Sequence, residues 1–181
     1  MPFAIELALD RESAAAVRTL WRRLAEAGIR FMATSGADPH VSLGIWDSLE
    51  VEPAIAEVTA LAPATAPVPL TFTAVRTFGA EVVYLALAPS PRLVDLQARV
   101  QARIGALGRR GWPHYAPAAW VPHCTLAMDL GSVSAATALA LAAELPLPLD
   151  ARLDRVGIVE FRPVRERFSR PLTGGAGAPR P

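Results

Sequence analysis

Two short stretches of the chain, PHVSL and PHCTL, repeat one order of residue types. Each places a histidine two residues before a hydroxyl side chain: His40 precedes Ser42, and His123 precedes Thr125. In a β-strand, residues two apart project from the same side, so each pair would share one face. Two imidazoles can act as general base and general acid on opposite sides of a phosphorus centre, while hydroxyl groups donate hydrogen bonds to the phosphate oxygens. These residue types predict proton-transfer chemistry that requires no metal or cofactor.

The elements expected around the two motifs also repeat. Apolar periodicity and turn residues predict helices at about 11–27, 53–61, 91–107 and 134–145, and strands at about 2–9, 40–46, 70–78, 81–87, 123–130, 151–161 and 164–172. A short extended piece is expected at 29–31. Each half then reads strand, helix, motif-bearing strand, helix, strand, which is an internal repeat of about 80 residues. If the halves pack about a pseudo-twofold axis, both histidines and both hydroxyls face one cleft.

The composition is that of a folded domain without a strong overall charge. The chain has 181 residues, of which 52% are hydrophobic, so it can bury a sizeable core. It carries 18 basic and 17 acidic residues, a formal net charge of +1. No global field therefore draws it to nucleic acid or to an anionic membrane, and an anionic ligand must be bound by local groups.

Two residue types narrow the chemistry further. All the basic residues are arginine, and the absence of lysine excludes Schiff-base chemistry and a nucleotidyl-lysine intermediate. The single cysteine, Cys124, allows no disulfide within the chain, which is typical of cytoplasmic proteins. We see neither a basic leader nor an apolar run long enough to span a bilayer, and we expect a cytoplasmic protein.

On these motifs the chain resembles the 2H phosphoesterases, which include bacterial 2'-5' RNA ligases and 2',3'-cyclic phosphodiesterases. The signature of that family is a pair of H-x-[ST]-hydrophobic motifs, matched here by HVSL and HCTL. The duplicated order of elements and the approach HYAPAAWVPHCTLA extend the resemblance to about Leu172. The first motif has serine where threonine is frequent, which keeps the hydroxyl donor but loses the methyl group that restricts its rotamer.

The resemblance implies an α+β fold that is bilobal and duplicated, with two antiparallel sheets lining a central cleft and helices outside. We expect one domain over 1–171, with lobes near 1–79 and 80–171 between which the C-terminal strands can cross. A disordered tail is expected at 172–181, because this segment is rich in glycine and proline.

The implied activity is that of a metal-independent phosphodiesterase without a cofactor. Its catalytic residues would be His40, Ser42, His123 and Thr125. The substrate would be a nucleotide or RNA end carrying a 2',3'-cyclic phosphate, or a related 2'-linked nucleotide, and the reverse reaction would be 2'-5' RNA ligation. The small net charge favours a small nucleotide at least as much as a long RNA. No membrane association and no lasting protein partner are expected.

Three other interpretations compete with this one. The cleft could be a nucleotide-binding sensor or scaffold without catalysis, although retention of both histidines and both hydroxyls favours an enzyme. The histidines could be purely structural, which leaves the duplicated motif unexplained. A zinc site would need a third ligand from His114, Asp38 or Asp129, and the two motifs lack close ligand spacing.

Further candidates lie outside the motifs. Trp46, expected on the same strand face as the first histidine, and Tyr115 could stack on a base, the alternative being that they only pack the loop. Arg76 and Arg165 are candidate phosphate contacts, the alternative being exposed charges at a strand edge. Cys124 alternates away from the cleft and is expected to be a small buried residue rather than a nucleophile.

Overall fold

The structure is a computed structural model that describes residues 1–131 and 133–175. The described elements follow in the order β1 (Phe3–Leu9), α1 (Arg11–Glu26), α2 (Phe31–Thr34), β2 (His40–Leu49), α3 (Val51–Leu61), β3 (Val68–Phe78), β4 (Val82–Leu87), α4 (Pro91–Ile104), η1 (Gly105–Leu107), β5 (Gly108–Gly111), η2 (Pro113–Tyr115), β6 (His123–Ala127), α5 (Ala135–Ala142), β7 (Leu149–Glu160) and β8 (Arg165–Pro171). The fold is α+β, as expected.

Local signals account for most of these elements. Asp10 caps α1 by accepting hydrogen bonds from the main-chain N–H groups of Glu12 and Ser13, and Ser90 caps α4 in the same way. Two details of the prediction are wrong. The extended piece expected at 29–31 runs into the short helix α2, and the loop expected before the second motif contains strand β5, which pairs with β2.

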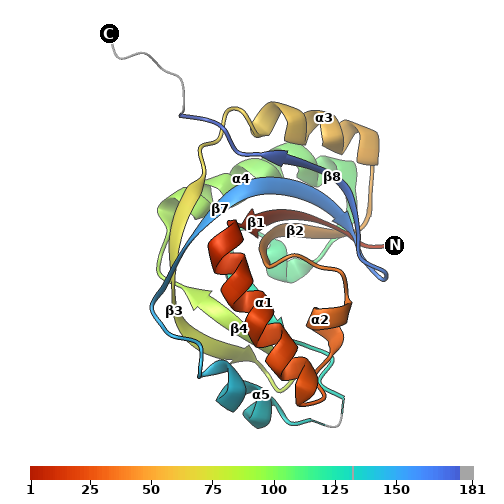
Figure 1. The fold of residues 1–181 in the computed structure, drawn as a ribbon. Helices are drawn as coiled ribbons and strands as arrows, with labels where there is room; N and C mark the ends of the chain where they lie inside the picture. The colour runs from red at the N-terminus through yellow and green to blue at the C-terminus, as the bar shows by residue number, and fades with distance from the viewer. Residues whose placement is uncertain (132, 176–181) are drawn as a thin grey trace.

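Within the described residues, all the strands lie in one curled, antiparallel, eight-stranded sheet, and the predicted arrangement of two separate sheets is not found there (Figure 1). The strand order is β5-β2-β1-β7-β3-β4-β6, with β8 also paired to β7. The long strand β7 explains the difference. Its first residues pair with β3 from Val68 to Phe72, and the rest pairs with β1 over Phe3–Leu9, so one strand joins both halves of the chain. Local periodicity cannot reveal such a crossing.

Helices cover the sheet in two groups, and the apolar core lies beneath them. Helices α1 and α5 pack near β3, β4, β6 and β7, whereas α3 and α4 pack near β2, β7 and β8 (Figure 1). Helix α1 buries one stripe of side chains: Val17, Leu20, Trp21 and Leu24. Each large apolar side chain removed from water in this way stabilises the fold by about 1.5–3 kcal/mol.

The chain remains packed just beyond β8. Leu172 is 3% exposed, and the main-chain N–H groups of Thr173 and Gly174 donate to the carbonyl oxygens of Ala62 and Thr65. Residues 172–175 of the segment expected to form a tail thus contact the end of α3, and residues 176–181 lie outside the described part.

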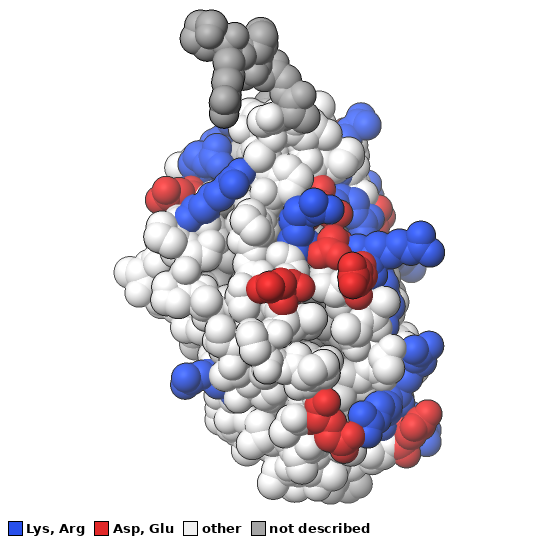
Figure 2. Space-filling view, turned by 60° about the vertical axis from the view of Figure 1, so that its left-hand side comes forward, with Lys and Arg blue, Asp and Glu red and all other residues white. Residues whose placement is uncertain are grey.

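The surface agrees with the small net charge of the sequence. On the face shown in Figure 2, basic and acidic side chains lie in small groups separated by uncharged surface. Among the residues described, no helix combines the length and the apolar character needed to cross a bilayer.

Candidate active site

Strands β2 and β6 begin at the two motif histidines, and the structure brings both motifs to one cleft of about 790 Å³. The side chains of His40, Ser42, His123 and Thr125 all line it. The two strands are not paired in the sheet, but β6 returns close to β2 because the sheet curls. The four residues singled out by the repeated motif therefore share one cavity.

The two histidine rings are held in the same way. His40 donates its Nδ1–H to the carbonyl oxygen of Asp38 at 2.6 Å, and His123 donates its Nδ1–H to that of Val121 at 2.7 Å. In both cases the acceptor precedes the histidine by two residues, with a proline between them. This bond fixes the tautomer and leaves Nε2 of each ring available for proton transfer.

The surroundings of the two rings differ. Nε2 of His40 lies 3.3 Å from Oε1 of Glu6 on the neighbouring strand β1. The ring of His123 lies instead in T-shaped contact with the rings of Phe78 and Tyr84, with centroids 4.9 and 5.3 Å away. Burial lowers the pKa of His123, which favours its neutral form. Burial also raises the pKa of the Glu6 carboxyl, although its proximity to His40 acts in the opposite direction.

Glu6 is a site residue that sequence reasoning missed. It lies within the first strand, where Phe3, Ile5, Leu7 and Leu9 alternate along one face. One feature of the sequence could have identified it. A single acidic residue inside a strand projects from the face opposite to the apolar one, and its carboxylate needs a polar or charged partner if that face is buried.

A β-bulge changes which residues of β2 face the cleft. Ile5 pairs with Gly44 but Glu6 pairs with Ser42, so Leu43 is the extra residue. Beyond the bulge the alternation reverses: Ile45 lines the cleft, whereas Trp46 is 3% exposed and does not line it. The prediction that Trp46 shares a face with His40 is therefore wrong, because it assumed an unbroken strand.

Side chains from α4 hold this bulge against the turn that carries Tyr115. The amide nitrogens of Gln97 and Gln101 both donate to the carbonyl oxygens of Leu43 and Tyr115, at 2.8–3.2 Å. Trp120 donates its indole N–H to the carbonyl oxygen of Ser42 at 3.0 Å. The main chain around the first hydroxyl is thus fixed from two sides.

Tyr115, a predicted stacking residue, lines the cleft beside the first motif. Burial raises the pKa of its hydroxyl to about 12, with a further contribution from the Glu6 charge, and a hydrogen bond with the Ser42 side chain opposes the rise. Tyr115 therefore stays protonated near neutral pH.

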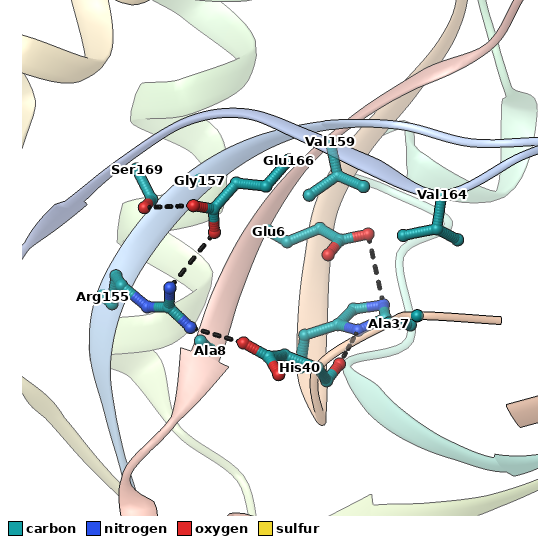
Figure 3. Close-up of a pocket in the computed structure, with 12 residues that line it drawn as sticks. Glu6, Ala8, Ala37, His40, Arg155, Gly157, Val159, Val164, Glu166 and Ser169 are labelled. Atoms are coloured by element: carbon teal, nitrogen blue, oxygen red, sulfur yellow. Dashed lines mark hydrogen bonds and ion pairs between the residues drawn. The ribbon is translucent and has the colours of Figure 1, made fainter. Parts of the chain in front are cut away.

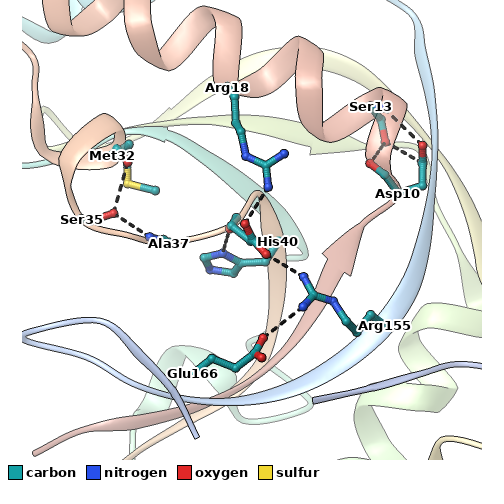
Figure 4. A network of polar contacts seen from close by, with 10 residues as sticks. Asp10, Ser13, Arg18, Met32, Ser35, Ala37, His40, Arg155 and Glu166 are labelled. Atoms are coloured by element: carbon teal, nitrogen blue, oxygen red, sulfur yellow. Dashed lines mark hydrogen bonds and ion pairs between the residues drawn. The ribbon is translucent and has the colours of Figure 1, made fainter. Parts of the chain in front are cut away.

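The loop before His40 is held by ion pairs. Asp38 binds Arg18 from α1 and Arg155 from β7, each at 2.6 Å, and Arg155 also binds Glu166 at 3.1 Å (Figure 4). Burial alone would raise the pKa of Asp38, but the hydrogen bonds from the two guanidinium groups lower it. Asp38 is thereby fixed as an anion, and its carbonyl oxygen is held in place for the His40 ring.

The two predicted phosphate contacts do not line the cleft. Arg76 is exposed on β3 opposite Tyr84, and Arg165 is exposed at the start of β8 opposite Glu160. The arginine that does line the cleft is Arg162, in the turn between β7 and β8.

The remaining walls are mostly apolar. Phe78 stacks on Tyr84 with ring centroids 4.0 Å apart and the planes inclined by 19°, and it is 36% exposed at the cleft. Trp112 and Phe161, which also line the cleft, meet edge to face with ring centroids 5.8 Å apart. In the described part of the chain, the charged side chains that line the cleft are Glu6, Glu81 and Arg162, apart from its histidines.

Cys124 lies on the opposite face of β6 from its two motif neighbours. It is fully buried, and burial raises the pKa of its thiol to about 12. A protonated, enclosed thiol is a poor nucleophile. Within residues 1–131 and 133–175, no three of the histidine, cysteine and acidic side chains are grouped as metal ligands.

Comparison with known families gives one match that spans most of the chain. The family described as the 2'-5' RNA ligase superfamily matches residues 9–164. No curated protein is recognisably similar to the chain in sequence.

Solved structures of similar fold are distant in sequence. TT0787 of Thermus thermophilus is 18% identical with a TM-score of 0.62, covering 97% of this chain and 100% of that one. Escherichia coli LigT, solved in complex with ATP, is 14% identical with a TM-score of 0.58, covering 94% and 96%. A structure described as a phosphoesterase is 15% identical with a TM-score of 0.58, covering 94% and 97%. At these identities the likeness concerns the fold.

Proposed function

Because the chain belongs to the 2'-5' RNA ligase superfamily, we propose that it is a metal-independent phosphodiesterase that hydrolyses 2',3'-cyclic phosphates of nucleotides or RNA ends. One observation carries the proposal. Two histidines in one cleft have their Nδ1 atoms bound to main-chain carbonyls, and each is accompanied by a hydroxyl side chain on the same strand. This is the arrangement required for general acid–base catalysis at phosphorus.

The environments of the rings suggest their roles. His123, whose pKa is lowered by burial, would take a proton from the attacking water at Nε2. As the bond from the water oxygen to phosphorus forms, the bond from phosphorus to one ribose oxygen breaks, and His40 would donate its Nε2 proton to that oxygen. Ser42 and Thr125 would donate hydrogen bonds to the non-bridging oxygens, where negative charge grows in the transition state.

The same groups would support the reverse reaction. An RNA 5'-hydroxyl in place of water would lose its proton to the base, attack the cyclic phosphate and form a 2'-5' linkage without ATP. The acid and base exchange roles between the two directions, as microscopic reversibility requires.

The walls of the cleft favour a substrate with one phosphate and an aromatic base. The volume of about 790 Å³ is that of a small-molecule site. Phe78 offers an exposed ring face close to His123, suited to stacking on a base. Two of the charged lining residues, Glu6 and Glu81, are acidic, which disfavours a run of phosphates. We therefore propose a mononucleotide or a terminal nucleotide as the group bound in the cleft.

The test is hydrolysis of 2',3'-cyclic nucleotides and of an oligonucleotide with a cyclic-phosphate end, in the presence of EDTA. We expect turnover by the wild-type protein, and a loss of at least about 100-fold in His40→Ala and in His123→Ala. Arg165→Ala, outside the cleft, serves as a control that keeps the wild-type rate. Near wild-type rates in both histidine variants would refute the proposal, and nucleotide binding without turnover would support a sensor instead.

A further inference from the structure

The carboxylate of Glu6 makes the two motif histidines unequal. Glu6 and His40 lie on adjacent strands, in a part of the sheet where Glu6 pairs with Ser42 and Ala8 pairs with His40. The side chains are 14% and 17% exposed, and Oε1 points at Nε2, as Figure 3 shows. The contact therefore involves the very nitrogen that would exchange a proton with substrate.

The charges around this pair are balanced by partners of their own. The titratable groups that face it from neighbouring elements are Arg18 (α1), Asp38 (the loop before β2), Tyr115 (η2), His123 (β6), Arg155 (β7) and Glu166 (β8). Asp38 and Glu166 are ion-paired with arginine, and Tyr115 is neutral. The imidazole of His40 is left as the basic group in direct contact with the Glu6 carboxyl, with Nε2 3.3 Å from Oε1.

A second, smaller pocket reaches the pair from behind. It has a volume of about 110 Å³, and both Glu6 and His40 line it as well as the main cleft. Figure 3 shows the two side chains among the residues that line this pocket. Arg155, Glu166 and Ser169 supply polar groups on its far side. Such a volume accommodates about three water molecules. Solvent can thus reach the pair while a substrate fills the main cleft.

We propose that Glu6 is a positioning residue that orients the ring of His40 and holds the proton on its Nε2. The inference rests on the proposed function, in which His40 is the acid. When the ribose oxygen leaves phosphorus, the Nε2 proton passes to it, and the pair is left with one uncompensated negative charge. The proton taken from the attacking water leaves His123 for bulk solvent, and one proton from bulk solvent, relayed by water in the smaller pocket, restores the pair, so that no net charge is left behind.

Two substrates whose leaving groups differ in their need for a proton distinguish this role of Glu6 from a purely structural one. Glu6→Gln keeps the size of the side chain but removes its charge. His40 therefore retains a neighbouring side chain, but the carboxylate that holds the proton on its Nε2 is lost. Hydrolysis of a 2',3'-cyclic nucleotide, which expels an alkoxide, should fall by about 10- to 100-fold in kcat. Hydrolysis of a p-nitrophenyl phosphodiester, whose leaving group needs little protonation, should fall by less than about threefold. KM should stay equal or decrease, because an anionic group has left an anion-binding site.

Glu160→Gln is the matched control. Glu160 is also a buried glutamate, 5% exposed and ion-paired with Arg167, but it lies on β7 and lines neither pocket. The Glu160→Gln variant should leave unchanged the ratio between the hydrolysis rates of the 2',3'-cyclic nucleotide and the p-nitrophenyl phosphodiester. Equal losses on both substrates in Glu6→Gln would overturn the inference, since a distorted site slows both reactions alike.

A second measurement does not depend on turnover. The chain has three histidines, so the ring nitrogens can be resolved by 15N NMR of histidine-labelled protein. Near neutral pH we expect a protonated Nε2 for His40 and an unprotonated Nε2 for His123, with the difference abolished in Glu6→Gln. Equal protonation in the wild type would overturn the inference, whereas a clear difference in a protein that hydrolyses no cyclic phosphate would count against the proposed function alone.

Discussion

Replacing Gly44 by alanine tests how the bulge in β2 is held. A Cβ at this position would lie 2.7 Å from Nε2 of Gln101 and 2.9 Å from Cζ3 of Trp46. Optimal separation between non-bonded carbon atoms is about 3.5–4.0 Å, so both neighbours must move.

The indole has little room to do so. Trp46 is 3% exposed, and it also lies against Gly108 and Gly111, where an added Cβ would meet it as well. Overpacking of this kind costs about 1–3 kcal/mol. At about 2–4 °C per kcal/mol for a domain of this size, the melting temperature should fall by about 2–12 °C. Displacement of Gln101 would also weaken its bonds to Leu43 and Tyr115.

Thermal unfolding and hydrolysis assays check the two parts of this prediction. Besides the fall in melting temperature, we expect kcat on a 2',3'-cyclic nucleotide to drop by about tenfold, because a small displacement of positioning groups is costly to catalysis. Gly105→Ala is the control: its Cβ would meet only Oε1 of Gln101, at an ordinary 3.6 Å, and its φ is −55°. If Gly44→Ala were as stable and active as Gly105→Ala, this account of the bulge would be refuted.

Four further predictions concern the cleft itself. Burial lowers the pKa of His123, so the acidic limb of kcat/KM should lie below the ordinary imidazole value of about 6.5, and a limb above that value in a pH–rate profile would contradict its role as base. Burial raises the pKa of Glu6 from 4.5, which means that its ionisation weakens the folded state as pH rises from that value to the higher folded pKa. The free energy of unfolding of Glu6→Gln, relative to that of the wild type, should therefore be higher at neutral pH than at pH 4. Urea unfolding at these two pH values would show no such increase if this sign were wrong. Ser42→Ala should lower kcat by about 10- to 100-fold through loss of an oxyanion donor, while Ser42→Thr stays within a few-fold; similar rates in Ser42→Ala and the wild type would exclude that donor. Phe78→Ala should raise KM for a cyclic nucleotide by about 5- to 100-fold through lost stacking, and an equal increase for a cyclic ribose phosphate without a base would argue against stacking.

The two motifs and most of the local elements could be predicted from the sequence. Histidine and hydroxyl two residues apart share a strand face for purely local reasons, and the repeat of PHVSL and PHCTL identified the pair without knowledge of the fold. Caps such as Asp10 and Ser90, with the apolar stripe of α1, likewise depend on neighbours within a few residues. These features could be predicted because periodicity and capping are short-range properties of the chain.

Tertiary structure alone decided the rest. The single curled sheet results from β7 pairing with β1 and β3, which are distant in sequence. The extra residue Leu43 places Trp46 on the face of β2 that points away from the cleft, and no sequence pattern within β2 predicts this bulge. Glu6 joined the site because the pairing of β1 with β2 places its carboxyl beside His40. Long-range pairing, bulges and burial are set by the packing of the whole chain, and for that reason the side-chain neighbours of the two histidines, Glu6, Phe78 and Tyr84, could be found only in three dimensions.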